Sequence, residues 1–208
     1  MTPDLIQGNH EHLWQNGVIV MAATKHAQQI KQDSQDYLAT ALLQLLATKD
    51  LADLTVTQVV KRAGVSRMAF YRNFNTLDDV LTAYFGPIMT ARFADIAKLP
   101  TADKLQALGD FFTSFSTTLK LSADRGFEHI IRQVFNDNMR TFYATNATWH
   151  GITSTQQTYW ISFMSAGVYA IWRDWLLGGQ QESLTTIHDL IATFQQTTMM
   201  GLLQQDKS

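Results

Sequence analysis

The sequence predicts an all-α protein, and three observations support this expectation. Apolar residues recur at helical spacing through most of the 208 residues, whereas no segment alternates apolar and polar residues as a strand would. Ser, Thr, Asp, Gly and Pro stand where helices would begin and end. With 46% hydrophobic and 16% charged residues, the chain can bury a sizeable core.

The composition excludes several classes of protein. There is no cysteine, so disulfides and thiolate metal sites are absent, and no apolar run is long enough to cross a membrane. His10 and His12 flank Glu11, but no third ligand stands near them, so we predict neither a metal site nor a cofactor. The N-terminus lacks the layout of a secretory signal, and we expect a cytoplasmic protein.

The N-terminal residues 1–30 show no clean period, and we expect a flexible extension in which Met21 is a second candidate start. The first helix is predicted to begin near Asp33 or Ser34 and to run to about Lys49. Its predicted apolar stripe consists of Leu38, Ala41, Leu42, Leu45 and Leu46.

Two short helices joined by a tight turn are predicted next. Thr55 is a good N-cap for a helix over Val56–Ala63, and Gly64 stands where a left-handed residue would end that helix. Ser66 then caps the following helix. This arrangement is a helix-turn-helix. The alternative is an ordinary hairpin inside a bundle, which the sparse apolar content of the second helix disfavours.

The second short helix has an unusual outer face. Its apolar positions Phe70 and Phe74 point inward, which leaves outward Arg67, Met68, Ala69, Tyr71 and Arg72. This face has no carboxylate, and the window 49–72 carries a net charge of +3 in a chain whose formal net charge is −2. A locally basic helix suits a polyanion, so we predict that it enters a DNA groove. On charge alone, a solvated surface helix is an equally good explanation.

Further helices are predicted after Phe74. The fourth is predicted to begin near Thr76, which has capping-box-like spacing with Asp79. It is expected to kink at Pro87 and to end before Pro100. The next three are predicted over residues 101–121, 122–134 and 136–148. Two long apolar helices close the chain, one over 154–177 and one that begins after Ser183.

The stretch Leu54–Phe74 resembles the N-terminal domain of TetR/AcrR-family transcriptional regulators. The similar features are a threonine-rich start, Ala63-Gly64-Val65-Ser66, and the ending Tyr71-x-x-Phe74. Members of that family are all-helical homodimers, with three DNA-binding helices and a C-terminal domain that dimerises and often binds a small ligand. The resemblance therefore implies a DNA-binding domain over 31–78, and a helical dimerisation and effector domain over 79–208.

The resemblance also implies roles for single residues. The residues expected to contact base edges are Arg67, Met68 and Ala69. The residues expected to contact phosphate are Thr57, Ser66, Tyr71, Arg72 and Asn73. The family usually places a phosphate-holding lysine where this chain has Leu77, so we expect that contact to be either lost or replaced by Asn73, Asn75 or Lys49. The expected function is a repressor that binds a palindromic, double-stranded operator.

The two last helices are expected to form the homodimer interface. The residues predicted for it are Trp160, Met164, Val168, Trp172, Trp175, Leu184, Ile187, Ile191 and Phe194. An apolar effector pocket is predicted from Phe111, Phe115, Phe127, His129, Arg132, Tyr143, Trp160 and Phe163. The alternative for this aromatic set is plain core packing.

Other functions stay open beside this one. The chain can regulate through a protein partner without a small effector, or it can be an interaction protein that has lost DNA binding. An enzyme is the third alternative, but no nucleophile, metal or phosphate-loop motif is present. Asp124, Glu128 and His129 fit a capped helix start better than an acid–base site.

Overall fold

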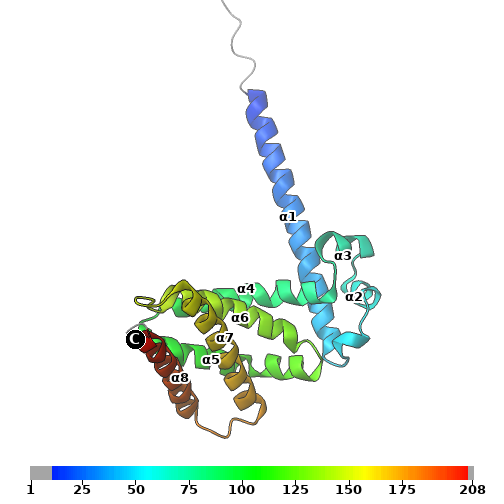
Figure 1. The fold of residues 1–208 in the computed structure, drawn as a ribbon. Coiled ribbons are helices and arrows are strands. Elements are labelled where there is room, and N and C mark those ends of the chain that lie inside the picture. Colours follow the sequence, from blue (N-terminus) through cyan, green and yellow to red (C-terminus); the bar gives the residue numbers. More distant parts are fainter. Residues whose placement is uncertain (1–10, 206–208) are drawn as a thin grey trace, which may run out of the picture. The chain divides into compact units, whose positions relative to one another are not determined.

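The structure is a computed structural model that describes the backbone of residues 11–205 and the side chains of residues 28–204. Within residues 11–205 it contains eight α-helices, one short 3₁₀ turn and no strands, which confirms the all-α prediction (Figure 1). The chain divides into two compact units, Met1–Leu45 with Thr55–Val80, and Leu46–Leu54 with Leu81–Ser208. None of the helices over 11–205 has the length and apolarity that a membrane span requires.

The first unit contains α1 (Glu11–Leu46), α2 (Val56–Ala63) and α3 (Arg67–Asn73). The predicted start of the first helix near Asp33 is wrong, because α1 already runs from Glu11. Hydrogen bonds one turn apart, such as Gln29 Nε2 to Asp33 Oδ1 at 2.8 Å, continue the helix through the polar stretch. The predictions for residues 1–10 and for the His10–His12 pair lie outside the residues whose side chains are described.

A small apolar core holds the three helices of the first unit together. Leu38 and Leu42 of α1, Val59 of α2 and Phe70 of α3 are fully buried. Phe74, directly after α3, is buried against the ring of Phe70, with their centroids 6.0 Å apart. The inward positions predicted for Phe70 and Phe74 are therefore confirmed, and each short helix has one face exposed to solvent.

The second unit is built from longer helices. These are α4 (Leu77–Ala97), which begins in the first unit, α5 (Thr101–Asp124), α6 (Glu128–Asn146), α7 (Ser154–Leu177) and α8 (Leu184–Gln205). A 3₁₀ turn, η1 (Leu51–Asp53), belongs to this unit as well. Figure 1 shows α5, α6, α7 and α8 lying side by side, and each of α5 and α7 packs on the other three. α4 continues through Pro87.

The predicted helix boundaries between residues 121 and 136 are wrong. Ser122 does not cap a new helix, because its hydroxyl donates back to the Leu119 carbonyl at 2.7 Å inside α5. The break falls instead at Gly126, whose φ of 77° ends the helical path, and the next residue, Phe127, is fully buried. α6 then passes residue 135 without interruption.

Aromatic side chains fill the core of the second unit. Phe112 of α5 stacks on Trp172 of α7, with ring centroids 5.1 Å apart and an angle of 8° between the planes. Phe135 of α6 lies edge-on to Phe112 at 4.7 Å, and Phe85 of α4 stacks on Phe127 at 6.2 Å. Aromatic pairs of this kind add to the burial free energy, so these rings stabilise the packing of α4, α5, α6 and α7.

Candidate nucleic-acid interface

Capping residues set both ends of α2 and therefore the place of the turn that leads to α3. Thr55 and Gln58 form a capping box at the start of α2, in which the Thr55 amide donates to Gln58 Oε1 at 2.8 Å. α2 ends at Gly64, whose φ of 69° lies in the left-handed region and whose amide donates to the Val60 carbonyl. The predicted roles of Thr55 and Gly64 are confirmed. Gln58 was not predicted, although its place three residues after the cap is a signal for it.

Ser66 sets the start of α3. Its Oγ accepts a hydrogen bond from the Ala69 amide at 3.0 Å, which satisfies one of the free amides of the first turn. Phe70 then faces the core, and Val65 in the turn is half-buried. The cap and the buried ring together fix which side of α3 faces outward.

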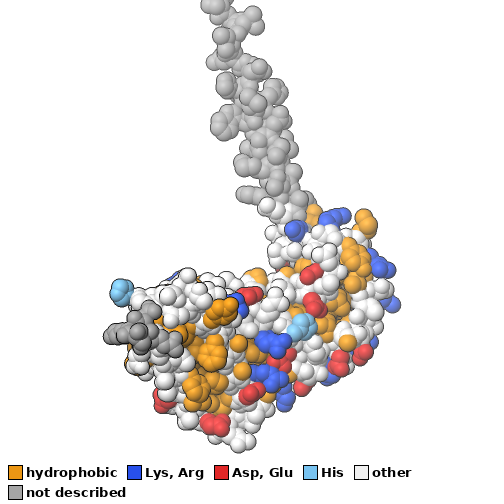
Figure 2. Space-filling view, viewed as in Figure 1, with side chains coloured by type: hydrophobic (Ala, Val, Ile, Leu, Met, Phe, Trp, Pro, Cys, Tyr) orange, Lys and Arg blue, Asp and Glu red, His pale blue; other side chains and the backbone are white. Residues whose placement is uncertain are grey.

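The outward face of α3 is basic, aromatic and apolar. Met68 is 75% exposed and Tyr71 is 52% exposed, while Arg67 and Arg72 are also exposed and Ala69 is half-buried. Figure 2 shows basic and hydrophobic side chains next to each other over α2 and α3. The guanidinium carbon of Arg67 lies 5.9 Å from the centroid of the Tyr71 ring, within the range of a cation–π contact.

The residues predicted to contact phosphate differ in their exposure and in their hydrogen bonds within the chain. Thr57, Ser66, Tyr71 and Arg72 are exposed. Asn73 is half-buried, because its Nδ2 donates to the Ala69 carbonyl at 2.8 Å, and its buried Oδ1 has no hydrogen-bond partner among the described residues. The Asn73 side chain is therefore hydrogen-bonded within α3, and its Nδ2 has only one N–H left for another acceptor.

The position where the family pattern has a lysine is apolar and covered. Leu77 is only 9% exposed and cannot reach a phosphate. Beside it, the backbone amides of Asn75 and Thr76 donate to Asp79 Oδ2 at 2.8 and 2.9 Å, and these bonds lower the pKa of the Asp79 carboxyl. This box fixes the start of α4. Lys49 and Asn75 are exposed.

One side-chain hydrogen bond between α1 and α2 was not predicted. Arg62 Nε on α2 donates to Gln44 Oε1 on α1 at 2.8 Å, so this arginine ties the two helices together. The two residues are far apart in sequence, and no local pattern indicates the pair. Of the four basic residues of α2 and α3, Lys61, Arg67 and Arg72 have no ion-pair partner among the residues described.

The residues predicted for an effector pocket do not form one site. Tyr143 and Trp160 line the same cavity in the second unit, whereas His129 and Arg132 line a separate, polar depression on α6. The other four line neither. Phe111 and Phe127 are buried, Phe115 is half-buried, and Phe163 is 64% exposed.

The residues predicted for a dimer interface need a correction. Most of them are buried in the core of their own chain and offer no surface to a partner: Trp160, Met164, Val168, Trp172, Trp175, Ile187 and Ile191. Leu184 is half-buried, and only Phe194 is exposed. Helical spacing reveals that a face is apolar, but it does not reveal whether that face packs inside the chain or outside it.

The geometry of the two short helices defines a helix-turn-helix protein. Residues 38–84, which include α2 and α3, match the family model of the bacterial regulatory proteins of the tetR family. Over these residues the chain therefore has a helix-turn-helix of the tetR-family type. The match covers the last part of α1, all of α2 and α3, and the start of α4.

Two solved proteins are similar to the chain in structure. One is the dihydroxyacetone kinase operon activator DhaS, with 16% identity, a TM-score of 0.46, and coverage of 81% of this chain and 96% of that one. The other is NalD of Pseudomonas aeruginosa, the secondary repressor of the MexAB-OprM multidrug efflux pump, with 15% identity and a TM-score of 0.42 over 83% of this chain and 98% of that one. No curated protein matches the sequence.

Proposed function

We propose that the chain represses transcription as a homodimer, in which the α3 helices of two protomers bind a palindromic operator. The observation that carries the proposal is the outward face of α3, where Arg67, Met68, Tyr71 and Arg72 are exposed together without a carboxylate. Such a face has no packing role in its own unit. A regulator of this kind acts where the DNA is, in the cytoplasm.

A helix of this size fits the major groove, and its N-terminal residues reach the base edges. Arg67, at the first position of α3, can make two hydrogen bonds to the O6 and N7 acceptors of guanine. Met68 and Ala69 offer apolar contact to a thymine methyl group. We assign base recognition to these three residues.

The phosphate contacts flank that face. The Ser66 oxygen accepts from the Ala69 amide, which leaves its hydroxyl hydrogen free to donate to a phosphate oxygen. Thr57 at the start of α2, and Tyr71 and Arg72 on α3, are exposed and can donate as well. Asn73 has one N–H left for the same purpose. These groups position the helix and carry no sequence information themselves.

The dimer interface is proposed on the outer faces of α7 and α8. Tyr159 is 72% exposed and Phe163 follows it one turn later, and on α8 Leu190 and Phe194 repeat this spacing. Figure 2 shows hydrophobic side chains gathered over these two helices. Exposed apolar patches of this kind mark interaction surfaces, and a two-fold axis is the commonest way to cover one.

Control by a small effector that releases the operator is part of the proposal. The alternative is a regulator that responds to a protein partner instead, and the polar depression around Arg132 and Arg140 is a surface for that.

The family is one of regulators rather than enzymes, and the proposal includes no catalytic step.

The test is selection of genomic fragments by the purified full chain, followed by titration of a selected fragment and of random DNA at several salt concentrations. The proposal predicts that the selected fragment binds more tightly at every salt concentration, and that both affinities fall as salt rises. Equal binding to both DNAs, or none, would leave an interaction protein as the better account.

A further inference from the structure

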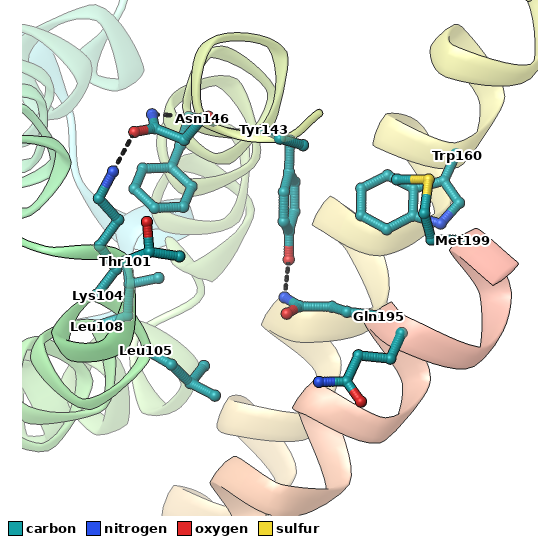
Figure 3. A pocket seen from close by; sticks show the side chains of 12 residues that line it. Thr101, Lys104, Leu105, Leu108, Tyr143, Asn146, Trp160, Gln195 and Met199 are labelled. Atoms are coloured by element: carbon teal, nitrogen blue, oxygen red, sulfur yellow. Dashed lines mark hydrogen bonds between the residues drawn. The ribbon is translucent and has the colours of Figure 1, made fainter. Parts of the chain in front are cut away.

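A cavity of about 310 Å³ lies among α5, α6, α7 and α8 in the second unit (Figure 3). Its size is at the lower end of the range for small-molecule sites. The walls are mainly apolar and aromatic, and they are formed by Leu105, Leu108, Phe142, Trp160 and Met199. The indole N–H of Trp160 donates to Thr198 Oγ1 at 2.9 Å, which holds the ring in the wall.

One end of this cavity carries the cation of Lys104, and the neighbouring Asp103 is exposed and does not line the cavity. Lys104 Nζ donates to Asn146 Oδ1 at 2.5 Å and lies 5.9 Å from the centroid of the Phe142 ring. None of the described residues that line the cavity is an aspartate or a glutamate, and the Lys104 side chain is half-buried. An ammonium group has three N–H donors, so two are left for a ligand.

The start of α5 adds to the positive potential at the same end. Thr101, the first residue of α5, lines the cavity, and the N-cap residue Pro100 makes no side-chain capping bond. The first-turn amides of a 24-residue helix therefore contribute a partial positive charge near Lys104. In Figure 3, Thr101 and Lys104 lie on one side, and Trp160 and Met199 on the other.

Two uncharged polar side chains of the cavity, Gln195 and Tyr143, bond each other. Gln195 Nε2 donates to the Tyr143 hydroxyl oxygen at 2.6 Å, between the basic side and the Trp160 side. Burial raises the pKa of the Tyr143 hydroxyl, so this group stays neutral and brings no negative charge into the cavity. Lys104 is thus the one formal charge among the described lining residues.

We propose that this cavity binds a small organic acid with an apolar body, in which Lys104 pairs with the carboxylate and Trp160 and Met199 contact the body. A single cation in an otherwise uncharged wall matches one negative charge, and it suits a carboxylate better than a phosphate, which is usually held by several donors. The inference rests on the proposed function, because it names the class of effector.

The test is isothermal titration of the full-length protein without DNA, with 3-phenylpropanoate and octanoate as probes and 3-phenylpropanamide as the neutral match. Both acids are expected to bind, and the amide at least about tenfold more weakly than its acid. Lys104→Met keeps the apolar stem and should remove this preference. Lys120→Met, an exposed lysine on the same helix, is the matched control and should bind the acids as the wild type does.

Three outcomes would overturn the proposal: no binding of either acid, equal binding of acid and amide, or an unchanged preference in Lys104→Met with native circular dichroism. Operator binding is measured separately with the selected fragment. Acid binding without operator binding would defeat the proposed function alone, and operator binding without acid binding would defeat this inference alone.

Discussion

Arg67 and Tyr71 lie one helical turn apart on α3, with the guanidinium carbon 5.9 Å from the ring centroid. The ring therefore holds the guanidinium on the outward face of the helix, where base edges would be met. Ordering a long side chain in advance reduces the entropy lost on binding. The phenol thus has two roles in the proposed interface, as a platform for Arg67 and as a phosphate donor.

These two roles are separable by substitution. Tyr71→Phe keeps the ring and removes the hydroxyl, so it should weaken binding to all DNA sequences about equally, by about 0.5–1.5 kcal/mol. Tyr71→Ala also removes the platform and should lower specificity for the selected fragment. Titrations of selected and random DNA measure both effects. A loss in Tyr71→Phe that is confined to the selected fragment would refute the phosphate role.

The proposed dimer surface predicts an effect of Phe163, which is exposed on α7. Phe163→Glu places a charge in an apolar interface, so sedimentation should report a monomer where the wild type is a dimer. Affinity for the operator should fall with it. Leu99→Glu, at an exposed apolar residue after α4, is the control and should stay dimeric. A dimeric Phe163→Glu protein would place the interface elsewhere.

Gly109 of α5 is predicted to tolerate no side chain. A Cβ there would lie 2.1 Å from His188 Nε2 and 2.8 Å from Trp172 Cη2, and Trp172 is fully buried. Gly109→Ala should therefore lower the free energy of unfolding by about 1–3 kcal/mol in urea titrations.

Gly86, inside α4, is the matched control, because a Cβ there meets nothing within 4 Å. Gly86→Ala should leave stability unchanged or raise it by up to about 1 kcal/mol. Equal stability of the two variants would contradict a close contact between Gly109 and His188.

Glu128 is predicted to make stability depend on acidic pH. Arg173 holds the pKa of this carboxyl below its ordinary value of 4.5, through a pair of hydrogen bonds of which Arg173 Nη2 to Glu128 Oε2 measures 2.9 Å. Because the folded-state pKa is the lower one, the contribution is complete above the unfolded-state pKa and is lost as the pH falls through the folded-state value.

Urea titrations between pH 7 and pH 3 should show this loss in the wild type. Glu128→Gln should flatten that part of the profile and cost on the order of 1 kcal/mol at pH 7. Glu182→Gln, at an exposed position, serves as the control. An unchanged acid profile in Glu128→Gln would assign the pH dependence to other carboxylates.

The sequence predicted best what depends on neighbours along the chain. Thr55, Gly64 and Ser66 act within four residues of themselves, so their roles follow from residue type and spacing. Ser122 shows the limit of this reasoning, because a serine can either cap a helix or bond back into one. The start of α1 at Glu11 was missed for a related reason, since a segment without a clean apolar period can still be helical.

Features that depend on tertiary packing were not predictable. The buried tryptophans of α7 and the exposed Phe163 have the same helical signature in the sequence, and only the packed structure separates core from surface. Lys104 and Asn146 come from different helices, and their contact defines the basic end of the cavity. The residues predicted for an effector pocket do not line one cavity, because aromatic residues at helical spacing are also what a packed core requires.

The most direct test of the central claim is a gel-shift titration of a selected genomic fragment with wild-type protein and with Arg67→Ala. If α3 recognises the operator through this residue, the variant should lose about 1–3 kcal/mol of binding free energy and discriminate less against mutated operators. Lys120→Ala should bind as the wild type does. Unchanged affinity and discrimination in Arg67→Ala would contradict the account.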